Sequence, residues 1–267
     1  MDTIQKTSVN QRQLKEALEL VIPFSKPNDA IKEGLDPSTT QDKVLIDLDN
    51  SCLVASDHIR LALAKLAVVP EGDFFCKPLQ GKFEISSEFA KSLKTFLSKK
   101  KKGNPVEISL EKETVCFTVG EETHRTNRLQ ETFPDYQEQF TSNKGKEKEE
   151  IYFEIQKDTL LEKIEAVLSK DDPLVLFKLS DQGVTLSREK TFDPENTATV
   201  IPEDMSINNE LYFGLKAKYL REGLKKQSGL IRFTANNPEL LNSKGWCISF
   251  WRLRDHIDYY IAPISIS

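Results

Sequence analysis

Cysteine is scarce in this sequence, and the cysteines that are present lie far apart. Cys52, Cys76, Cys116 and Cys247 form no Cys-x-x-Cys pair, which is the spacing that zinc sites commonly use. Four scattered thiols in a chain of 267 residues also lack the density of a secreted disulfide framework. The sequence therefore predicts a cytoplasmic protein without a metal site.

Long apolar runs are missing too. The longest, such as residues 174–177, are far shorter than the roughly 20 residues of a membrane-spanning helix. The polar segment at residues 1–8 lacks the apolar stretch of a signal peptide. We expect no membrane partner.

Catalytic motifs are also absent. Without a Gly-x-x-x-x-Gly-Lys loop, the use of ATP is not expected. His58, His124 and His256 are the only histidines, and no nucleophile with an orienting third group accompanies them. A DNA-modifying enzyme would need clustered carboxylates or a metal set, and the sequence has neither. We predict packing or surface roles for the histidines, no cofactor and no enzymatic activity.

What the sequence does contain is apolar material for ordinary cores, with 38% apolar and 30% charged residues. At roughly 100–200 residues per domain, its length fits one large or two medium domains. Residues 141–150 are polar and charged throughout, which is typical of an exposed linker. We predict domains at residues 1–140 and 151–267, joined by this linker.

One pattern recurs along the chain. Phe83, Phe153 and Phe213 each lie in a short strand-like segment that leads into apolar residues at helical spacing, and a weaker copy begins at Val9. Short strand-like runs follow each helix. This order predicts an α+β fold with antiparallel sheets and two helices per domain. The expected helices lie at residues 11–21, 86–97, 158–168 and 217–224, and the expected strands at 43–48, 52–55, 106–110, 114–119, 174–179, 183–186, 230–233 and 259–262.

Positive charge is concentrated on two of these helices. Residues 86–102 hold six lysines and one glutamate, and residues 215–226 hold four lysines, one arginine and one glutamate. The formal net charge is −5, so these segments, at +5 and +4, leave −14 for the remainder. Two solvated helix faces are the alternative interpretation, and the run at residues 99–102 is equally consistent with a helix end favoured by the helix dipole.

The equivalence of the two basic helices favours a surface that binds phosphates without reading sequence, even in an acidic protein. No exposed aromatic series suggests the stacking of single strands. The candidate DNA-binding residues are Lys91, Lys94, Lys99, Lys100, Lys216, Lys218, Arg221 and Lys225.

Four segments resemble the bacterial DNA polymerase III β sliding clamp family, in the same order and spacing over nearly the whole chain. They are Val-Ala-Ser-Asp-His-Ile-Arg-Leu-Ala at 54–62, Arg-Leu-Gln-Glu-Thr-Phe-Pro-Asp-Tyr at 128–136, Ala-Asn-Asn-Pro-Glu at 235–239 and Tyr-Ile-Ala-Pro-Ile at 260–264. The matching segments belong to the family's middle and last domains. We therefore expect a short, two-domain form that begins directly on the middle domain.

The resemblance implies a DNA-clamp fold and a non-enzymatic ring that encircles duplex DNA and tethers a polymerase. It also implies a clamp loader, and a pocket for short partner peptides between the last two domains. A ring of six domains would need three copies of a two-domain chain, hence a homotrimer. The residues that the resemblance places in the pocket are Ser56, Arg60, Leu61, Pro134, Tyr260, Ala262, Pro263 and Ile264.

The pocket departs from the family pattern at three positions. His58 stands where the family has glycine, Ile59 where it has histidine, and Ala262 where a flexible methionine is usual. These departures indicate a narrower or different choice of peptide. An alternative function is that of an adaptor or decoy with the same fold, which binds polymerase peptides without forming a ring. Such a protein would not need basic helices.

Overall fold

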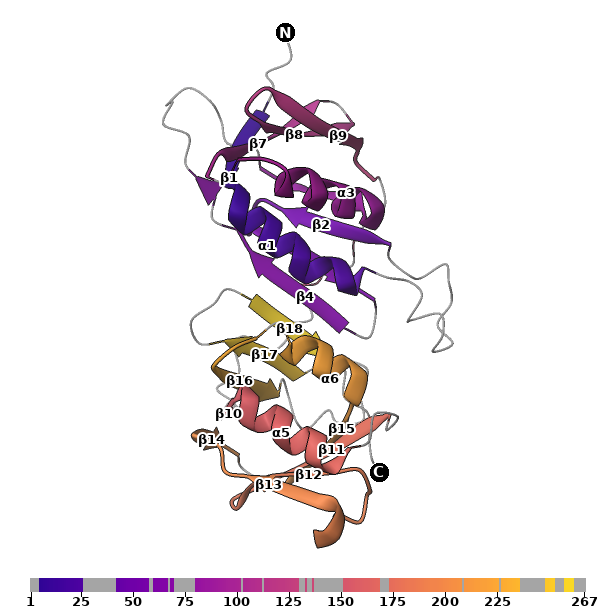
Figure 1. The fold of residues 1–267 in the computed structure, drawn as a ribbon, viewed down its shortest axis with the longest axis vertical. Helices are drawn as coiled ribbons and strands as arrows, with labels where there is room; N and C mark the ends of the chain where they lie inside the picture. Colours follow the sequence, from indigo (N-terminus) through magenta and orange to yellow (C-terminus); the bar gives the residue numbers. More distant parts are fainter. Residues whose placement is uncertain are drawn as a thin grey trace. The chain divides into compact units, whose positions relative to one another are not determined.

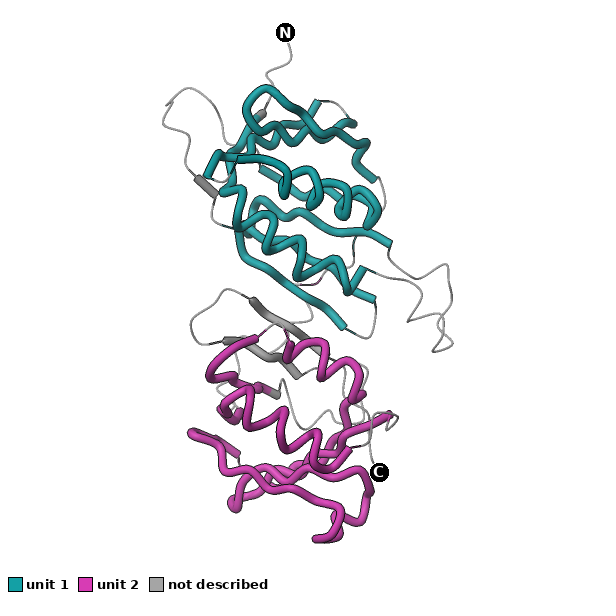
Figure 2. Tube along the Cα trace, viewed as in Figure 1, with its two compact units in different colours: residues 1–134 teal, residues 135–267 magenta. Residues whose placement is uncertain are grey.

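The chain forms two compact units, residues 1–134 and 135–267 (Figure 2). The predicted linker at residues 141–150 lies outside the described residues. The computed structural model describes residues 5–25, 42–57, 60–66, 68–69, 80–101, 103–111, 113–129, 133, 136, 151–168, 173–207, 209–225, 227–235, 248–252 and 257–261.

Each unit contains two α-helices in its described part, and each helix follows a strand without an intervening loop (Figure 1). This confirms the fourfold pattern that the sequence predicts. The strand and helix pairs are β1 (Gln5–Asn10) with α1 (Gln11–Val21), β6 (Lys82–Ser86) with α3 (Ser87–Ser98), β10 (Ile151–Gln156) with α5 (Lys157–Val167), and β15 (Leu211–Lys216) with α6 (Ala217–Leu224).

Side-chain caps explain how two of these strands turn directly into helices. The side chain of Asn10 accepts a hydrogen bond from the backbone N–H of Gln13 at 3.1 Å. Ser86 does the same for the N–H of Phe89, also at 3.1 Å. Each cap satisfies a donor that the first helical turn leaves unpaired, so the helix begins at the next residue.

In unit 1 the two helices cover two antiparallel sheets, with strand orders β5-β1-β7-β8-β9 and β4-β3-β2-β6. Helix α1 contacts β3 and β4, and α3 contacts β2 and β6. The short 3-10 helix η1 (Ile22–Phe24) extends α1. The remaining strands are β2 (Lys43–Asp47), β3 (Cys52–Ser56), β4 (Arg60–Lys65), β5 (Val68–Val69), β7 (Pro105–Glu111), β8 (Thr114–Val119) and β9 (Glu122–Asn127).

Unit 2 repeats this arrangement, with strand orders β14-β10-β16-β17-β18 and β13-β12-β11-β15. Helix α5 contacts β10, β12 and β13, and α6 contacts β11, β15 and β18. Its remaining elements are β11 (Leu174–Ser180), β12 (Gly183–Ser187), η3 (Pro194–Asn196), β13 (Thr197–Val200), β14 (Asp204–Ser206), β16 (Leu230–Ala235), β17 (Ile248–Arg252) and β18 (Ile257–Ile261).

Stacked phenylalanines mark the core of unit 2. Phe153 stacks on Phe233 with ring centroids 4.5 Å apart, and Phe177 stacks on Phe213 at 4.9 Å. All four rings are buried. Two of them, Phe153 and Phe213, are the residues that mark the sequence repeat. The predicted α+β fold, with two similar domains and two helices on antiparallel sheets in each, is confirmed.

Candidate nucleic-acid interface

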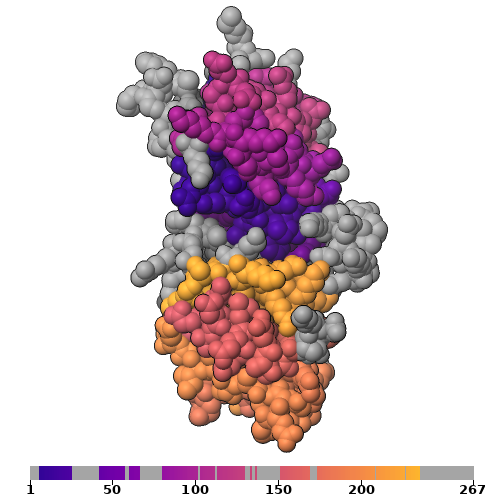
Figure 3. Space-filling view, in the orientation of Figure 1, coloured from indigo at the N-terminus to yellow at the C-terminus, as the bar shows by residue number. Residues whose placement is uncertain are grey.

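Helices α1 and α3 lie side by side in unit 1 and share one polar face. The buried side chain of Gln11, at the start of α1, donates a hydrogen bond to the carbonyl of Leu97, at the end of α3, at 2.9 Å. The apolar sides of both helices are buried, which leaves their polar sides at the surface. Figure 3, coloured by residue number, shows the two segments next to each other on the surface of unit 1. Charges on either helix can therefore act on the same ligand.

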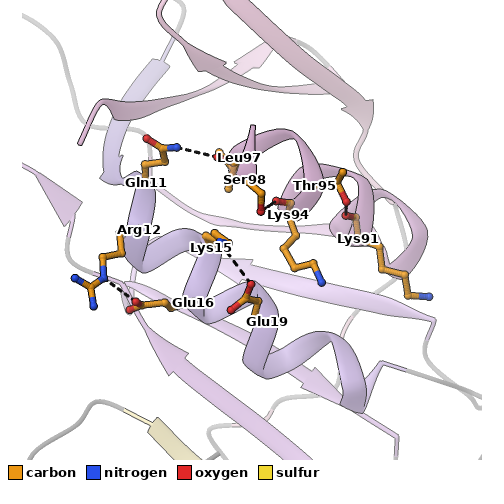
Figure 4. A network of polar contacts seen from close by, with 10 residues as sticks. All are labelled: Gln11, Arg12, Lys15, Glu16, Glu19, Lys91, Lys94, Thr95, Leu97 and Ser98. Carbon is orange, nitrogen blue, oxygen red and sulfur yellow. Dashed lines mark hydrogen bonds and ion pairs between the residues drawn. The ribbon is translucent and has the colours of Figure 1, made fainter. Parts of the chain in front are cut away.

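The α3 half of this surface is basic. Lys91 is exposed and Lys94 is half-buried, and neither ammonium forms an ion pair with the described residues (Figure 4). The hydroxyls of Thr95 and Ser98 donate to the carbonyls of Lys91 and Lys94 at 3.0 and 2.8 Å, and so turn back toward the helix. Among the described residues, these two ammonium groups are the cations of α3 that form no ion pair, and their role in binding DNA stays a prediction.

Lys99 and Lys100, which directly follow α3, differ in their contacts. Lys99 is exposed. Lys100 forms an ion pair with Glu122 of β9, its Nζ lies 4.5 Å from the centroid of the Phe96 ring, and its side chain is only 14% exposed. Of these two predicted DNA-binding residues, Lys100 therefore has its charge engaged inside unit 1.

Unit 2 has its basic residues on and around α6. Lys216 precedes the helix and Lys218 lies in its first turn, with their ammonium groups 5.7 and 5.6 Å from the ring centroid of Tyr219. Tyr219 is buried, whereas Lys218 and Lys225 are exposed and Arg221 is half-buried. All four of these basic residues are therefore at least partly exposed on unit 2.

The first helix of unit 1 carries as much negative as positive charge. Arg12 hydrogen-bonds Glu16 at 2.7 Å, and the pair Lys15–Glu19 has an N–O distance of 3.8 Å (Figure 4). Both pairs are spaced four residues apart, as is usual for ion pairs along a helix. The hydrogen bond to Glu16 raises the pKa of the Arg12 guanidinium.

Helix α5, the equivalent of α1 in unit 2, is also internally paired. Lys157 pairs with Asp158 at 3.1 Å and Lys163 with Glu162 at 3.2 Å. In both units, therefore, the second helix is basic and the first is neutral or acidic. Sequence reasoning found the basic helices but missed the pairing on the first helices, although the four-residue spacing of Arg12 and Glu16 signals it.

His124 of β9 lies beneath the basic helix. Its ring stacks on Phe89 at 4.7 Å and on Phe96 at 5.2 Å between centroids, and its Nε2 hydrogen-bonds the Ser92 hydroxyl at 3.0 Å. Partial burial lowers the pKa of His124 below the ordinary imidazole value. Of the two roles predicted for the histidines, packing or surface placement, His124 has the first. His58 and His256 lie outside the described residues.

Replacing His124 with phenylalanine should make the protein less sensitive to mild acid. Because the pKa of His124 is lowered in the folded state, the unfolded chain binds more protons below about pH 6.5. The stability that the neutral ring contributes is present above that pH and is lost as pH falls through the folded pKa. Phenylalanine keeps the stacking and does not titrate. Thermal melts from about pH 7.5 to 5.5 should show a smaller fall in Tm for His124→Phe than for the wild type; parallel profiles would contradict this.

The residues predicted for the peptide pocket are described only in part. The Ser56 hydroxyl donates to the carbonyl of Arg60 at 2.9 Å, the Arg60 side chain is fully buried against Asp57, and Leu61 is buried. For Tyr260, in β18, only the backbone is described. The structure thus gives Arg60 a role in holding its own hairpin, and the pocket stays a prediction. Pro134, Ala262, Pro263 and Ile264 lie outside the described residues, as do His58 and Ile59.

Several solved structures of bacterial clamps have the same architecture. The chain matches the DNA polymerase III beta subunit of Thermotoga maritima with a TM-score of 0.72 at 18% identity, over 98% of this chain and 66% of that one. It matches Caulobacter crescentus pol III beta with a TM-score of 0.74 at 15% identity, over 99% and 68%. The DNA polymerase sliding clamp of Pseudomonas aeruginosa matches with a TM-score of 0.70 at 16% identity, over 98% and 66%.

The fold is that of bacterial sliding clamps. The resemblance read from four sequence segments is thereby confirmed at the level of the fold. This chain spans about 66% of the length of the clamp from Pseudomonas aeruginosa. No protein-family model and no curated protein matches the sequence. Among the described helices, none has the length and apolar character needed to cross a membrane.

Proposed function

We propose that the protein is a non-enzymatic DNA sliding clamp that encircles duplex DNA without reading its sequence. The observation that carries this proposal is the equivalent placement of the basic helices α3 and α6 in two units of clamp fold. Lys91 and Lys94 on α3, and Lys218 on α6, lie on the solvent side of their helices. Lysine side chains so placed neutralise phosphates and give a sequence-independent affinity.

The clamp acts in the cytoplasm and tethers a DNA polymerase, which docks a short peptide in the predicted pocket; a clamp loader uses the same pocket. The matched structures from Pseudomonas aeruginosa are DNA polymerase sliding clamps, one of them with a ligand, and this supports a polymerase as the partner. Buried apolar anchors dominate interfaces of this kind. Leu61 and Ile264 are among the apolar residues that the resemblance places in the pocket, where they would receive the apolar anchors of the peptide.

The ring is a head-to-tail homotrimer, because a ring of six domains needs three chains with two clamp domains each. Identical head-to-tail contacts are heterologous and close only when the rotation fits. Each unit offers a strand for such a contact. Strand β9 of unit 1 and strand β13 of unit 2 each lie at the edge of their sheet, paired on one side only among the described strands. Backbone pairing of β9 with β13 of the next copy would join the sheets.

Light scattering over a concentration series should show a species of three times the chain mass of 30.4 kDa. The same preparation should remain on a nicked circular plasmid during gel filtration and leave it once the plasmid is linearised, because a ring slides off a free end. Retention that is equal on circular and linear DNA would indicate surface binding without a ring. A strict monomer at every concentration would contradict the ring. It would favour the alternative function, an adaptor that binds polymerase peptides without forming a ring.

A further inference from the structure

The shared polar face of α1 and α3 carries four cations, of which two are paired with other described residues and two are not. Lys91 and Lys94 of α3 form no ion pair with the described residues, whereas Arg12 and Lys15 of α1 are each paired within their own helix (Figure 4). The paired side chains are not buried: that of Arg12 is 84% exposed, and that of Lys15 is 37% exposed. Solvent can therefore reach all four side chains. The two groups differ in their ion pairs, not in their exposure.

The two carboxylates oppose a DNA contact in two ways. Glu16 accepts a hydrogen bond from Arg12 Nε at 2.7 Å, so a phosphate would have to displace it to use the same donor. Glu19 holds Lys15 less closely, at 3.8 Å. Both carboxylates also repel phosphates that come near the face, because their side chains are 55% and 46% exposed.

We propose that Glu16 and Glu19 are positioning residues that keep Arg12 and Lys15 from phosphates, and so restrict contact with DNA in unit 1 to α3. This inference rests on the proposed function. Each neutralised phosphate strengthens binding and steepens its dependence on salt. A clamp that moves along DNA needs phosphate contacts weak enough to break at every step. The two carboxylates limit that hold while Arg12 and Lys15 keep the face from becoming acidic.

The test is the double variant Glu16→Gln, Glu19→Gln, which removes both carboxylates with little change in shape or helix propensity. Fluorescence anisotropy with a short labelled duplex of mixed sequence would be measured over a range of KCl concentrations. The variant should bind more tightly at low salt. The slope of log K against log[KCl] should become steeper by about 0.9 for each freed cation that reaches a phosphate.

Two controls make the result specific. The quadruple variant that also carries Arg12→Gln and Lys15→Gln should return to the wild-type slope, since no cation is left to be freed. The variant Glu111→Gln, Glu121→Gln loses the same charge from the exposed end of β7 and from the exposed turn after β8, and it should leave the slope unchanged. Circular-dichroism melts would confirm that each variant is folded.

The possible failures are distinguishable. If the wild type binds the duplex and Glu16→Gln, Glu19→Gln binds with the same affinity and slope, this inference is overturned and the proposed clamp stands. An equal gain in the β7–β8 control would also overturn it, because net charge alone would then explain the effect. If neither the wild type nor the variant binds DNA at low salt, the proposed function fails and the inference fails with it.

Discussion

Replacing Asp57 with alanine should destabilise unit 1 by about 3–5 kcal/mol, the cost of removing one partner of a buried ion pair. The side chains of Asp57 and Arg60 are both 0% exposed. Asp57 Oδ2 accepts from Arg60 Nη2 at 2.6 Å and from Nε at 2.9 Å. The guanidinium also lies over the ring of Phe24, 4.9 Å from its centroid. Removal of the carboxylate takes away both of these hydrogen bonds to the fully buried guanidinium.

Asp57 also closes the hairpin between β3 and β4. Its Oδ1 accepts a hydrogen bond from the backbone N–H of Arg60 at 2.8 Å, and its own N–H donates to the carbonyl of Arg60 at 3.1 Å. Alanine would keep only the second of these bonds. The loss should therefore appear both as lower stability and as faster amide exchange in β4.

Urea unfolding monitored by circular dichroism would measure the effect. The matched control is Glu16→Ala, which breaks an exposed ion pair on α1 and should change the transition very little, because exposed pairs stabilise weakly. If Asp57→Ala lowers the free energy of unfolding by less than about 1 kcal/mol, the pair contributes little and water must reach the guanidinium. That outcome would also make Arg60 available to a peptide, as the resemblance predicts.

The strands that could be predicted from the sequence are those that bury apolar residues at a regular spacing. Strands β2, β3, β8 and β12 are rich in valine, isoleucine, leucine and phenylalanine, and each was expected within one residue of its bounds at either end. Strand β9 reads Glu-Thr-His-Arg-Thr-Asn, and the sequence pattern does not predict it. It forms because its backbone pairs with β8, a contact with another strand that its own composition does not show.

The candidate site, too, has features that the sequence predicts and features that it does not. The basic character of α3 and α6 is a local property of the sequence, so Lys91, Lys94 and Lys218 could be selected from it. The ion pair of Lys100 with Glu122, and the stacking of His124 between two rings of α3, join residues that are distant in the chain. Such contacts depend on how β9 packs under α3, and no local pattern reports that packing.

Reversing Lys91, Lys94, Lys218 and Arg221 to glutamate should nearly abolish binding to duplex DNA while leaving the fold intact. All four residues lie on α3 or α6, and none is buried. Each lost phosphate contact should reduce the slope of log K against log[KCl] by about 0.9, so the loss of four contacts would reduce it by about 3.6. The repulsion between four new carboxylates and the phosphates weakens binding further.

The control is a comparison of double variants within unit 2. Lys218→Glu, Arg221→Glu and Arg188→Glu, Lys190→Glu change the net charge equally, but Arg188 and Lys190 follow β12, which β11 separates from the β15 strand that leads into α6. Only the α6 variant should reduce the salt slope, because only its cations are expected to contact phosphates. Equal losses in the two variants would mean that the overall charge governs binding. An unchanged affinity and slope in the fourfold variant would falsify the assignment of DNA contact to these helices, and with it the strongest support for a clamp.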